Sequence, residues 1–245
     1  MVTNEKQHLF QGIYIGVSLI LMAIALLYKI SSVKYINYYY IGYLFSNLVL
    51  FLFLNEYTAE YLFHTNYRID LCLFVTMHVA ALFFIQFVRN YFVINNRFPI
   101  LDQFAGFYVK AGGGTVFGLL VLAYFDFVLY LNIAIYIELL NQFIILLLVS
   151  LVFIRTDNIG KIIIVGAYIS SISFLYMIFK SDLISLTVSN LLFYQSGYLA
   201  EILLMLIAIN FRYKHFEMEK QHVLVRNLKL ETENKLNMQE NLLLK

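Results

Sequence analysis

Seven long, uninterrupted apolar segments dominate this chain of 245 residues. A helix that crosses the hydrocarbon core of a bilayer needs about 20 apolar residues, and each segment reaches about that length. The segments lie near residues 9–28, 36–56, 68–92, 102–124, 127–154, 160–180 and 189–211. Their apolar runs are continuous, whereas the strands of a membrane β-barrel alternate apolar and polar residues. The sequence therefore predicts an all-α membrane protein, a bundle of seven transmembrane helices.

The composition points to the same class. Hydrophobic residues make up 62% of the chain and charged residues 13%, against about 45–50% and 25% in a soluble globular domain. A soluble fold of this length could not bury so much apolar surface, so the predicted solvent is lipid. The 17 basic and 15 acidic residues nearly balance, and we expect no direct contact with nucleic acid.

Basic residues in the short loops predict the orientation of the bundle, because cytoplasmic loops are enriched in Lys and Arg. One side holds Lys29, Lys34, Arg89, Arg97, Arg155, Lys161, Arg212 and Lys214. The other side holds only Lys6, Arg68 and Lys180, beside the acidic Glu56, Glu60 and Asp126. The basic side is predicted to be cytoplasmic. Residues 1–8 are then an extracellular N-terminal segment and residues 9–211 the transmembrane domain.

Residues 212–245 change character and are expected to form a cytoplasmic signalling helix. They contain neither glycine nor proline, so nothing ends the seventh helix at the membrane surface. Apolar residues at heptad spacing form a seam that consists of Leu224, Leu228, Met238 and Leu242. Glu231 and Lys235 occupy the seam positions between them and weaken it. A solvated amphipathic helix and a parallel coiled coil both fit this pattern. We expect the coiled coil, and with it a homodimer, because pairing explains why the helix extends.

Polar residues deep within the predicted spans fall at similar depths. At 1.5 Å per residue, Asn47 lies about 13 Å and His78 about 15 Å from the outer ends of their helices. Glu138 lies about 16 Å and Glu201 about 18 Å from theirs. Ionisable groups at membrane depth are costly and usually face the interior of a bundle. We therefore expect one polar layer near the midplane.

This layer has two interpretations. Its polar side chains either hold helices together, at about 0.6–2 kcal/mol each, or form a ligand pocket or conformational switch. The candidate ligand or switch residues are Asn47, His78, Glu138, Asn141, Gln195, Tyr198 and Glu201. Two carboxylates at one depth should not both be charged without a partner, and His78 is the candidate cation. The glycine run 112–114 indicates close helix packing, and Cys72 a small apolar filler.

Catalytic, metal-binding and cofactor motifs are missing from the sequence. It contains no HExxH and no GxSxG, and the triple glycine is not followed by the Lys-Ser/Thr of a phosphate loop. No lysine stands between Asn190 and Asn210, so the retinal Schiff base of a seven-helix rhodopsin cannot form there. We expect no enzymatic activity, no metal and no cofactor.

The segment SGYLAEILLMLIAINFRYKHFEME, residues 196–219, resembles one bacterial receptor family. That family comprises the seven-transmembrane receptors with diverse intracellular signalling modules. Its seventh helix carries a glycine, a glutamate, a Leu-rich run and an arginine before a coiled coil, which match Gly197, Glu201, Leu203–Leu206 and Arg212. The opening GIYIGVSLILMAIALLYKISSVKYINYYYIGYL is also similar, although Tyr28-Lys29 replaces the Asn or Asp common in the family.

The resemblance implies a multi-pass receptor of the bacterial inner membrane, working in a two-component or related pathway. Family members usually carry an extracellular carbohydrate-binding-like domain and a kinase, cyclase, phosphatase or DNA-binding output. The sequence shows neither, so the output would lie outside this chain, which is either a fragment or a reduced member. The alternative function is a small transporter or an ion or proton channel that uses Glu138 and Glu201.

Overall fold

The computed structural model describes residues 2–30, 38–54, 70–154, 156–180 and 188–243. Within these residues the protein contains seven long helices, one short helix and no strand. The long helices are α1 (Val2–Ile30), α2 (Tyr38–Leu54), α3 (Asp70–Tyr91), α5 (Pro99–Phe125), α6 (Phe127–Phe153), α7 (Asn158–Lys180) and α8 (Val188–Leu243). They correspond one to one with the seven predicted spans, so the predicted all-α bundle is confirmed.

Length and apolar composition allow several of these helices to cross a membrane. Four qualify outright, over Pro99–Phe125, Leu129–Phe153, Asn158–Phe179 and Leu192–Lys235. Two shorter apolar stretches, Gln11–Leu27 and Tyr38–Leu52, lie in α1 and α2. Large apolar side chains such as Ile20, Phe117 and Phe143 point outward from the bundle. Lipid would cover them, as expected for a multi-pass membrane protein.

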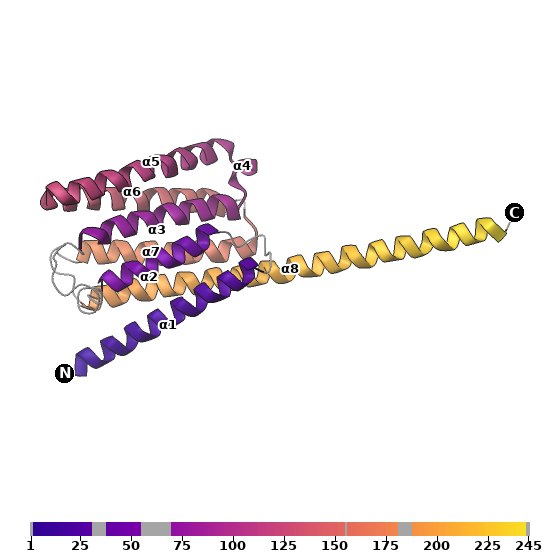
Figure 1. The fold of residues 1–245 in the computed structure, drawn as a ribbon, viewed down its shortest axis with the longest axis horizontal. Helices are drawn as coiled ribbons and strands as arrows, with labels where there is room; N and C mark the ends of the chain where they lie inside the picture. The colour runs from indigo at the N-terminus through magenta and orange to yellow at the C-terminus, as the bar shows by residue number, and fades with distance from the viewer. Residues whose placement is uncertain (1, 31–37, 55–69, 155, 181–187, 244–245) are drawn as a thin grey trace.

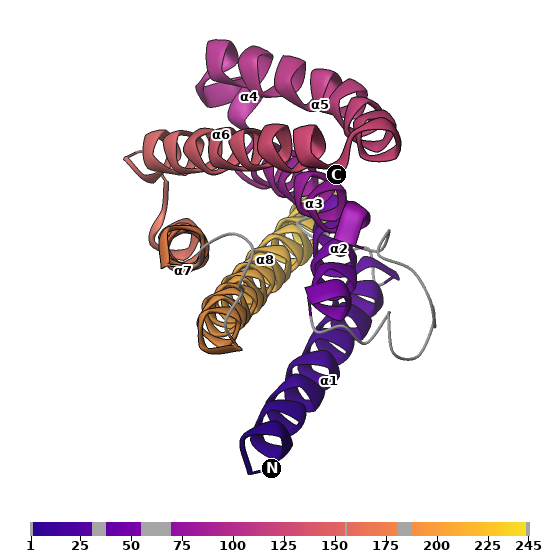
Figure 2. The same cartoon turned by 90° about the vertical axis from the view of Figure 1, so that its left-hand side faces the viewer.

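The long helices run roughly side by side, and α3 lies in the middle of the bundle (Figures 1 and 2). It packs against α2 on one side and against α5 and α6 on the other. The largest helix–helix interface joins α7 to α8. Helix α1 leans away at its N-terminal end and contacts α2 and α8 (Figure 2). The polar residues of α2, α3, α6, α7 and α8 therefore meet in one interior.

Helix α8 is a single unbroken helix of 56 residues. Its first part is buried in the bundle, and the part beyond Lys214 projects away from it, as Figure 1 shows in yellow. Leu224 and Leu228 of the predicted seam are more than half exposed on this projection. The side chains of Met238 and Leu242 lie outside the described residues. The predicted continuation of the seventh helix is present.

Local chemistry explains where the helices begin. Asp126 separates α5 from α6, and its carboxylate accepts a hydrogen bond of 3.0 Å from the backbone N–H of Leu129. This contact is an N-cap, which satisfies one of the free donors of a helix start. Pro99 occupies the first turn of α5, where its missing N–H costs nothing. Helix α1 begins at Val2 rather than at residue 9, since no glycine or proline stops it.

The turn between α3 and α5 contains the one helix that the apolar pattern did not predict. It is α4 (Ile94–Arg97), a single turn too short to leave a signal in hydrophobic spacing. Val93 precedes it with φ 50° and ψ 51°, in the left-handed region. That conformation is unusual for a β-branched residue. The strained turn brings the end of α3 next to the point where α8 leaves the bundle, since Val93 and Arg212 line the same hollow.

The glycine run does not interrupt α5, which is continuous from Pro99 to Phe125. The buried seam of α5 is narrow and consists of Ala105, Gly112, Leu119 and Ala123. A Cβ on Gly112 would collide with the side chain of Leu82 on α3, whereas one on Gly113 or Gly114 would meet open space. The predicted close packing therefore holds for Gly112 alone.

Candidate functional site

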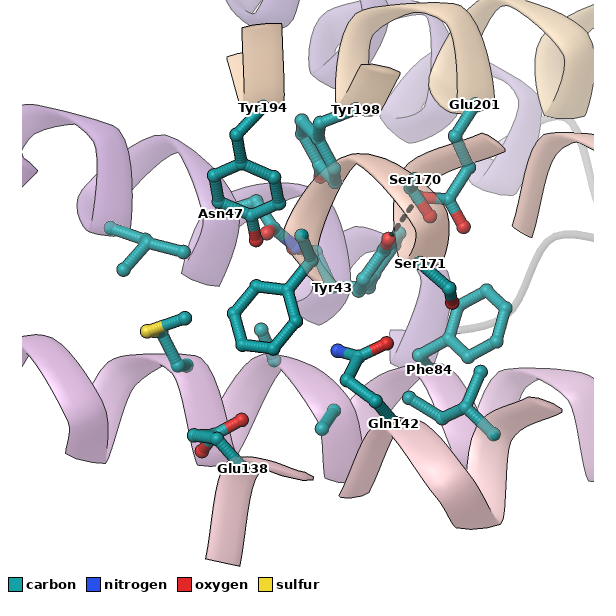
Figure 3. A pocket seen from close by; sticks show the side chains of 16 residues that line it. Tyr43, Asn47, Phe84, Glu138, Gln142, Ser170, Ser171, Tyr194, Tyr198 and Glu201 are labelled. Carbon is teal, nitrogen blue, oxygen red and sulfur yellow. Dashed lines mark hydrogen bonds between the residues drawn. The ribbon is translucent and has the colours of Figure 1, made fainter. Parts of the chain in front are cut away.

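A small polar cavity lies between α2, α3, α6, α7 and α8 (Figure 3). Its volume is about 40 Å³. A buried water needs about 10–15 Å³ measured in this way, so the cavity has room for two or three waters. Its polar lining consists of Tyr43, Asn47, Glu138, Gln142, Ser170, Ser171, Tyr194, Tyr198 and Glu201. The structure thus brings both predicted carboxylates to the edge of one interior space.

Glu201 of α8 is held by a partner from α2. The hydroxyl of Tyr43 donates a hydrogen bond of 2.7 Å to its carboxylate, between residues 158 positions apart in the sequence. Both side chains are buried. Figure 3 shows Ser170 of α7 beside the same carboxylate. Glu201 therefore lies where three helices meet.

Tyr43 and Tyr198 also belong to a buried aromatic cluster behind the cavity. The ring of Tyr198 packs against Tyr43, with centroids 5.7 Å apart, and against Phe51, with centroids 5.5 Å apart. Tyr14 of α1 lies 6.3 Å from Tyr198 between centroids. Aromatic pairs at such distances add to the stability that burial gives. This cluster ties α1 and α2 to the same stretch of α8 that carries Glu201.

Glu138 of α6 faces the cavity from the opposite side. It is 1% exposed, and its Oε1 atom has no hydrogen-bond partner among the described residues. Gln142, one turn further along α6, projects into the space between Glu138 and Glu201 (Figure 3). A buried polar atom without a partner in a native structure calls for a specific explanation.

A chain of hydrogen bonds next to the cavity links α3, α5 and α6. Tyr108 donates to Oδ1 of Asn141, and Nδ2 of Asn141 lies 2.8 Å from Nδ1 of His78. Nε2 of His78 lies 2.5 Å from the hydroxyl of Thr115. That hydroxyl donates to the carbonyl oxygen of Gly112 at 2.8 Å.

The direction of these bonds assigns a protonation state to His78. Because Oδ1 of Asn141 accepts from Tyr108, its amide nitrogen must donate to Nδ1 of His78. Since Thr115 uses its own proton on Gly112, Nε2 of His78 must donate to Thr115. His78 is then a neutral imidazole protonated at Nε2. It does not line the cavity, so it does not act as the cation that we expected for the carboxylates.

The other predicted residues are buried but less well connected. The amide of Asn47 lines the cavity and donates to the backbone oxygen of Tyr43 at 2.9 Å. Gln195 is fully buried, and neither polar atom of its side chain has a hydrogen-bond partner among the described residues. Gln195 does not line the cavity. The predicted layer is thus two neighbouring groups, the cavity around Glu201 and the network around His78.

A second polar cluster lies where α8 leaves the bundle. The guanidinium of Arg212 donates to Oδ2 of Asp157 at 2.8 Å and lies over the ring of Tyr91, 4.6 Å from its centroid. Oδ1 of Asp157 accepts from the backbone N–H of Gly160 at 2.9 Å and so caps α7. We call Asp157, Arg212 and Tyr91 the exit cluster. It fastens α8 to the start of α7 and the end of α3.

The electrostatics of the exit cluster favour ionised Asp157. Partial burial acts to raise the pKa of its carboxyl group, but the hydrogen bonds from Arg212 and Gly160 outweigh burial. The pKa is consequently below its ordinary value. At neutral pH the contact is a charge-assisted hydrogen bond, which is stronger than a neutral one.

The chain matches one protein family over most of its length. Residues 7–212 match the family described as 7TM diverse intracellular signalling. The chain belongs to that family. Both the resemblance to this receptor family and the seven-helix fold are thereby confirmed. No curated protein and no solved structure matches the chain.

The match includes all three polar clusters. It begins inside α1 and ends at Arg212, the arginine of the exit cluster. The cavity, the His78 network and the exit cluster therefore all lie in the part of the chain that is typical of the 7TM diverse intracellular signalling family. The helix beyond Arg212 lies outside the match.

Several residues of these sites were not predicted. Tyr43, Tyr108 and Asp157 acquire their roles from partners on other helices, which sequence spacing does not reveal. Lys110 is a different case, because it lies in the middle of the apolar helix α5, on an exposed face. Its position inside a predicted transmembrane span could have been noticed in the sequence. The orientation of the bundle relative to the membrane remains a prediction, and Arg68, Arg155 and Lys34 lie outside the described residues.

Proposed function

We propose that this chain is the membrane module of a sensory receptor and passes a signal through α8 to a cytoplasmic output. Membership of the 7TM diverse intracellular signalling family supports a sensory role. The observation that carries the proposal is the continuity of α8. One unbroken helix holds Glu201 at the cavity, Arg212 at the exit cluster and Leu224 on the projecting tail.

The mechanism needs an element with two arrangements whose balance a signal can shift. The contact between Tyr43 and Glu201 is the candidate switch, because it is a buried hydrogen bond that joins α8 to α2 inside the bundle. Breaking it would free α8 to move relative to α2. The exit cluster would then either transmit this movement of α8 to the tail or oppose the movement. The signal itself arrives from the outer face or from within the membrane.

The tail fits an output that depends on dimerisation. Its described residues beyond Lys214 are largely exposed, including the apolar side chains of Leu224 and Leu228. Exposed leucines at this spacing are typical of one half of a coiled coil. We propose a parallel homodimer that presents a kinase, cyclase or DNA-binding module carried outside this chain, with the basic side of the bundle in the cytoplasm of a bacterium.

A cation or proton transporter is the alternative, and the cavity shared by Glu138 and Glu201 favours it. Each of the helices α5, α6, α7 and α8 is unbroken along its length. This argues against a transporter, because many transporters have discontinuous helices near the midplane. Ion or proton flux into proteoliposomes, dependent on Glu138 and Glu201, would favour the transporter over the receptor.

Disulfide crosslinking of the tail in native membranes tests the receptor proposal. Cys72 is the only cysteine and is replaced by serine, and single cysteines are then placed at each position from 224 to 242. The proposal predicts crosslinks with a heptad period, and a changed pattern when Glu201→Gln weakens the contact with Tyr43. Ser196→Ala is the matched control, because Ser196 is exposed on α8 and its hydroxyl donates to the backbone oxygen of Leu192 in the same helix. The absence of crosslinks in folded protein would contradict the proposal.

A further inference from the structure

We propose that the cavity binds a small monovalent cation, Na⁺, through the carboxylate of Glu138. The inference concerns binding inside the bundle and does not depend on the receptor function. It departs from the sequence, whose motifs indicated no metal. Three observations carry it, namely an unpartnered buried carboxylate oxygen, the lack of a basic side chain around it, and a cavity of suitable size and lining.

The first observation is the state of Glu138. Its side chain is 1% exposed, and Oε1 lacks a hydrogen-bond partner in the described structure. Figure 3 shows its carboxylate turned toward the cavity. Glu201, in contrast, accepts a hydrogen bond from Tyr43. Asn141, at the next turn of α6, gives the Glu138 side chain a hydrogen bond but no charge. An ionised carboxylate buried without a counter-charge is very unfavourable, so Glu138 needs either a bound cation or a proton.

The second observation is that the protein supplies no cation here. None of the side chains around the cavity belongs to Lys, Arg or His. The nearest imidazole in the polar layer, His78, uses both ring nitrogens on Asn141 and Thr115. Lys110 is on the exposed face of α5. A cation that balances ionised Glu138 must therefore come from solution.

The third observation is the chemistry and size of the cavity. The lining includes Gln142, Asn47 and Ser171, whose side chains carry amide and hydroxyl oxygens, and oxygen ligands suit hard cations. The described residues contain no group of three His, Cys, Asp or Glu side chains that could hold a metal ion, which argues against a transition metal. A single carboxylate that has one unpartnered oxygen matches a single positive charge. About 40 Å³ accommodates an ion with one or two waters but no organic ligand.

A cation in this position would add a link between three helices that line the cavity. Glu138 and Gln142 are on α6, Asn47 is on α2 and Ser171 is on α7. Binding would therefore stabilise the folded bundle in proportion to ion concentration, because a ligand that binds only the folded state raises its stability.

Binding of radioactive ²²Na⁺ to the purified full chain in detergent tests the proposal directly, at one slightly alkaline pH. We expect saturable binding, displaced by unlabelled NaCl and not by choline chloride. We also expect the melting temperature to rise with NaCl to a plateau, and not to rise with choline chloride at equal ionic strength. No saturable binding and equal melting temperatures would overturn the proposal and leave a proton or water alone in the cavity.

Variants locate the site. Glu138→Gln should abolish ²²Na⁺ binding and make the melting temperature independent of Na⁺, while Asn132→Ala, on the exposed face of α6, should leave both unchanged. Gln142→Leu keeps the charge but removes a ligand, and should weaken Na⁺ binding severalfold even if Glu138→Gln fails to fold. Unaltered binding in either cavity variant would overturn the assignment. Na⁺ flux in proteoliposomes would count against the receptor function without affecting the site.

Discussion

Three polar residues of this bundle are held by specific partners on other helices. Glu201 is paired with Tyr43, His78 with Asn141 and Thr115, and Asp157 with Arg212 outside the apolar spans. Each contact satisfies groups that would otherwise be costly to bury. Removing one partner should therefore harm stability more than removing an exposed polar residue of the same helix.

Asn141→Ala tests this at the His78 network. The change leaves the hydroxyl of Tyr108 and Nδ1 of His78 without their partner. We expect a loss of about 1–3 kcal/mol in the free energy of unfolding. Denaturant unfolding in a defined detergent measures it, with Asn132→Ala on the exposed face of α6 as control, expected within about 0.5 kcal/mol of wild type. Equal effects of the two variants would show that the network does not stabilise the bundle.

Asp157 gives the exit cluster a dependence on pH. Since its pKa is below the ordinary value in the folded protein, ionised Asp157 stabilises the fold at neutral pH. That contribution is lost as the pH falls through the lowered pKa. Asp157 is 48% exposed, so solvent screens the ion pair. We expect about 1 kcal/mol from the pair and the helix cap together.

Asp157→Asn should accordingly lower the melting temperature at neutral pH and flatten its decline toward acid. Melting curves at several pH values, recorded for wild type and variant, measure both effects. Glu233→Gln, at an exposed position of the α8 tail away from the cluster, serves as control. A variant whose acid profile coincides with that of wild type would show that Asp157 contributes nothing to stability.

At the scale of helices, glycine determines how closely α7 and α8 approach. A Cβ on Gly166 of α7 would lie 3.2 Å from Cα and 3.3 Å from the carbonyl oxygen of Glu201. These are backbone atoms, so they cannot move aside as a flexible side chain would. Small residues at such crossings allow close helix packing in membranes. Gly166 thus sets the position of the residue that faces the cavity.

Gly166→Ala and Gly113→Ala should differ in sign. The first forces α7 and α8 apart and should cost about 1–3 kcal/mol. The second meets open space on α5 and should stabilise the helix by about 0.5–1 kcal/mol, as alanine replaces glycine. Thermal unfolding of both variants under one condition measures the difference. Equal destabilisation would mean that helix separation is not limited at Gly166.

The sequence predicted the helices better than their contacts. Apolar length identified all seven long helices, because a bilayer fixes the length of a span. The single turn α4 was missed, since four residues leave no periodic signal. Helical spacing placed Glu138 and Asn141 on one face. It could not reveal that Asn141 bonds to His78 or Glu201 to Tyr43, because the rotation of each helix depends on its neighbours.

At the scale of the whole molecule, α8 is the one helix that joins the buried polar layer to the tail. It packs most extensively against α7, is fastened at the exit cluster, and continues unbroken to Leu243. A displacement at Glu201 can thus reach the tail without crossing a loop. The proposed cation site lies on α6, on the other side of the cavity, where it would influence the same balance of helix positions.

The most direct test of this route is a distance measurement between spin labels in nanodiscs. One label replaces Ile154, exposed at the end of α6, and the other replaces Asn227 on the tail, in the Cys72→Ser background. Dilution with unlabelled protein restricts the measured distances to one chain. Glu201→Gln should shift the distance distribution or add a second population, while Ser196→Ala leaves it unchanged. Identical distributions in all three proteins would contradict the claim that α8 carries the state of the buried layer to the tail.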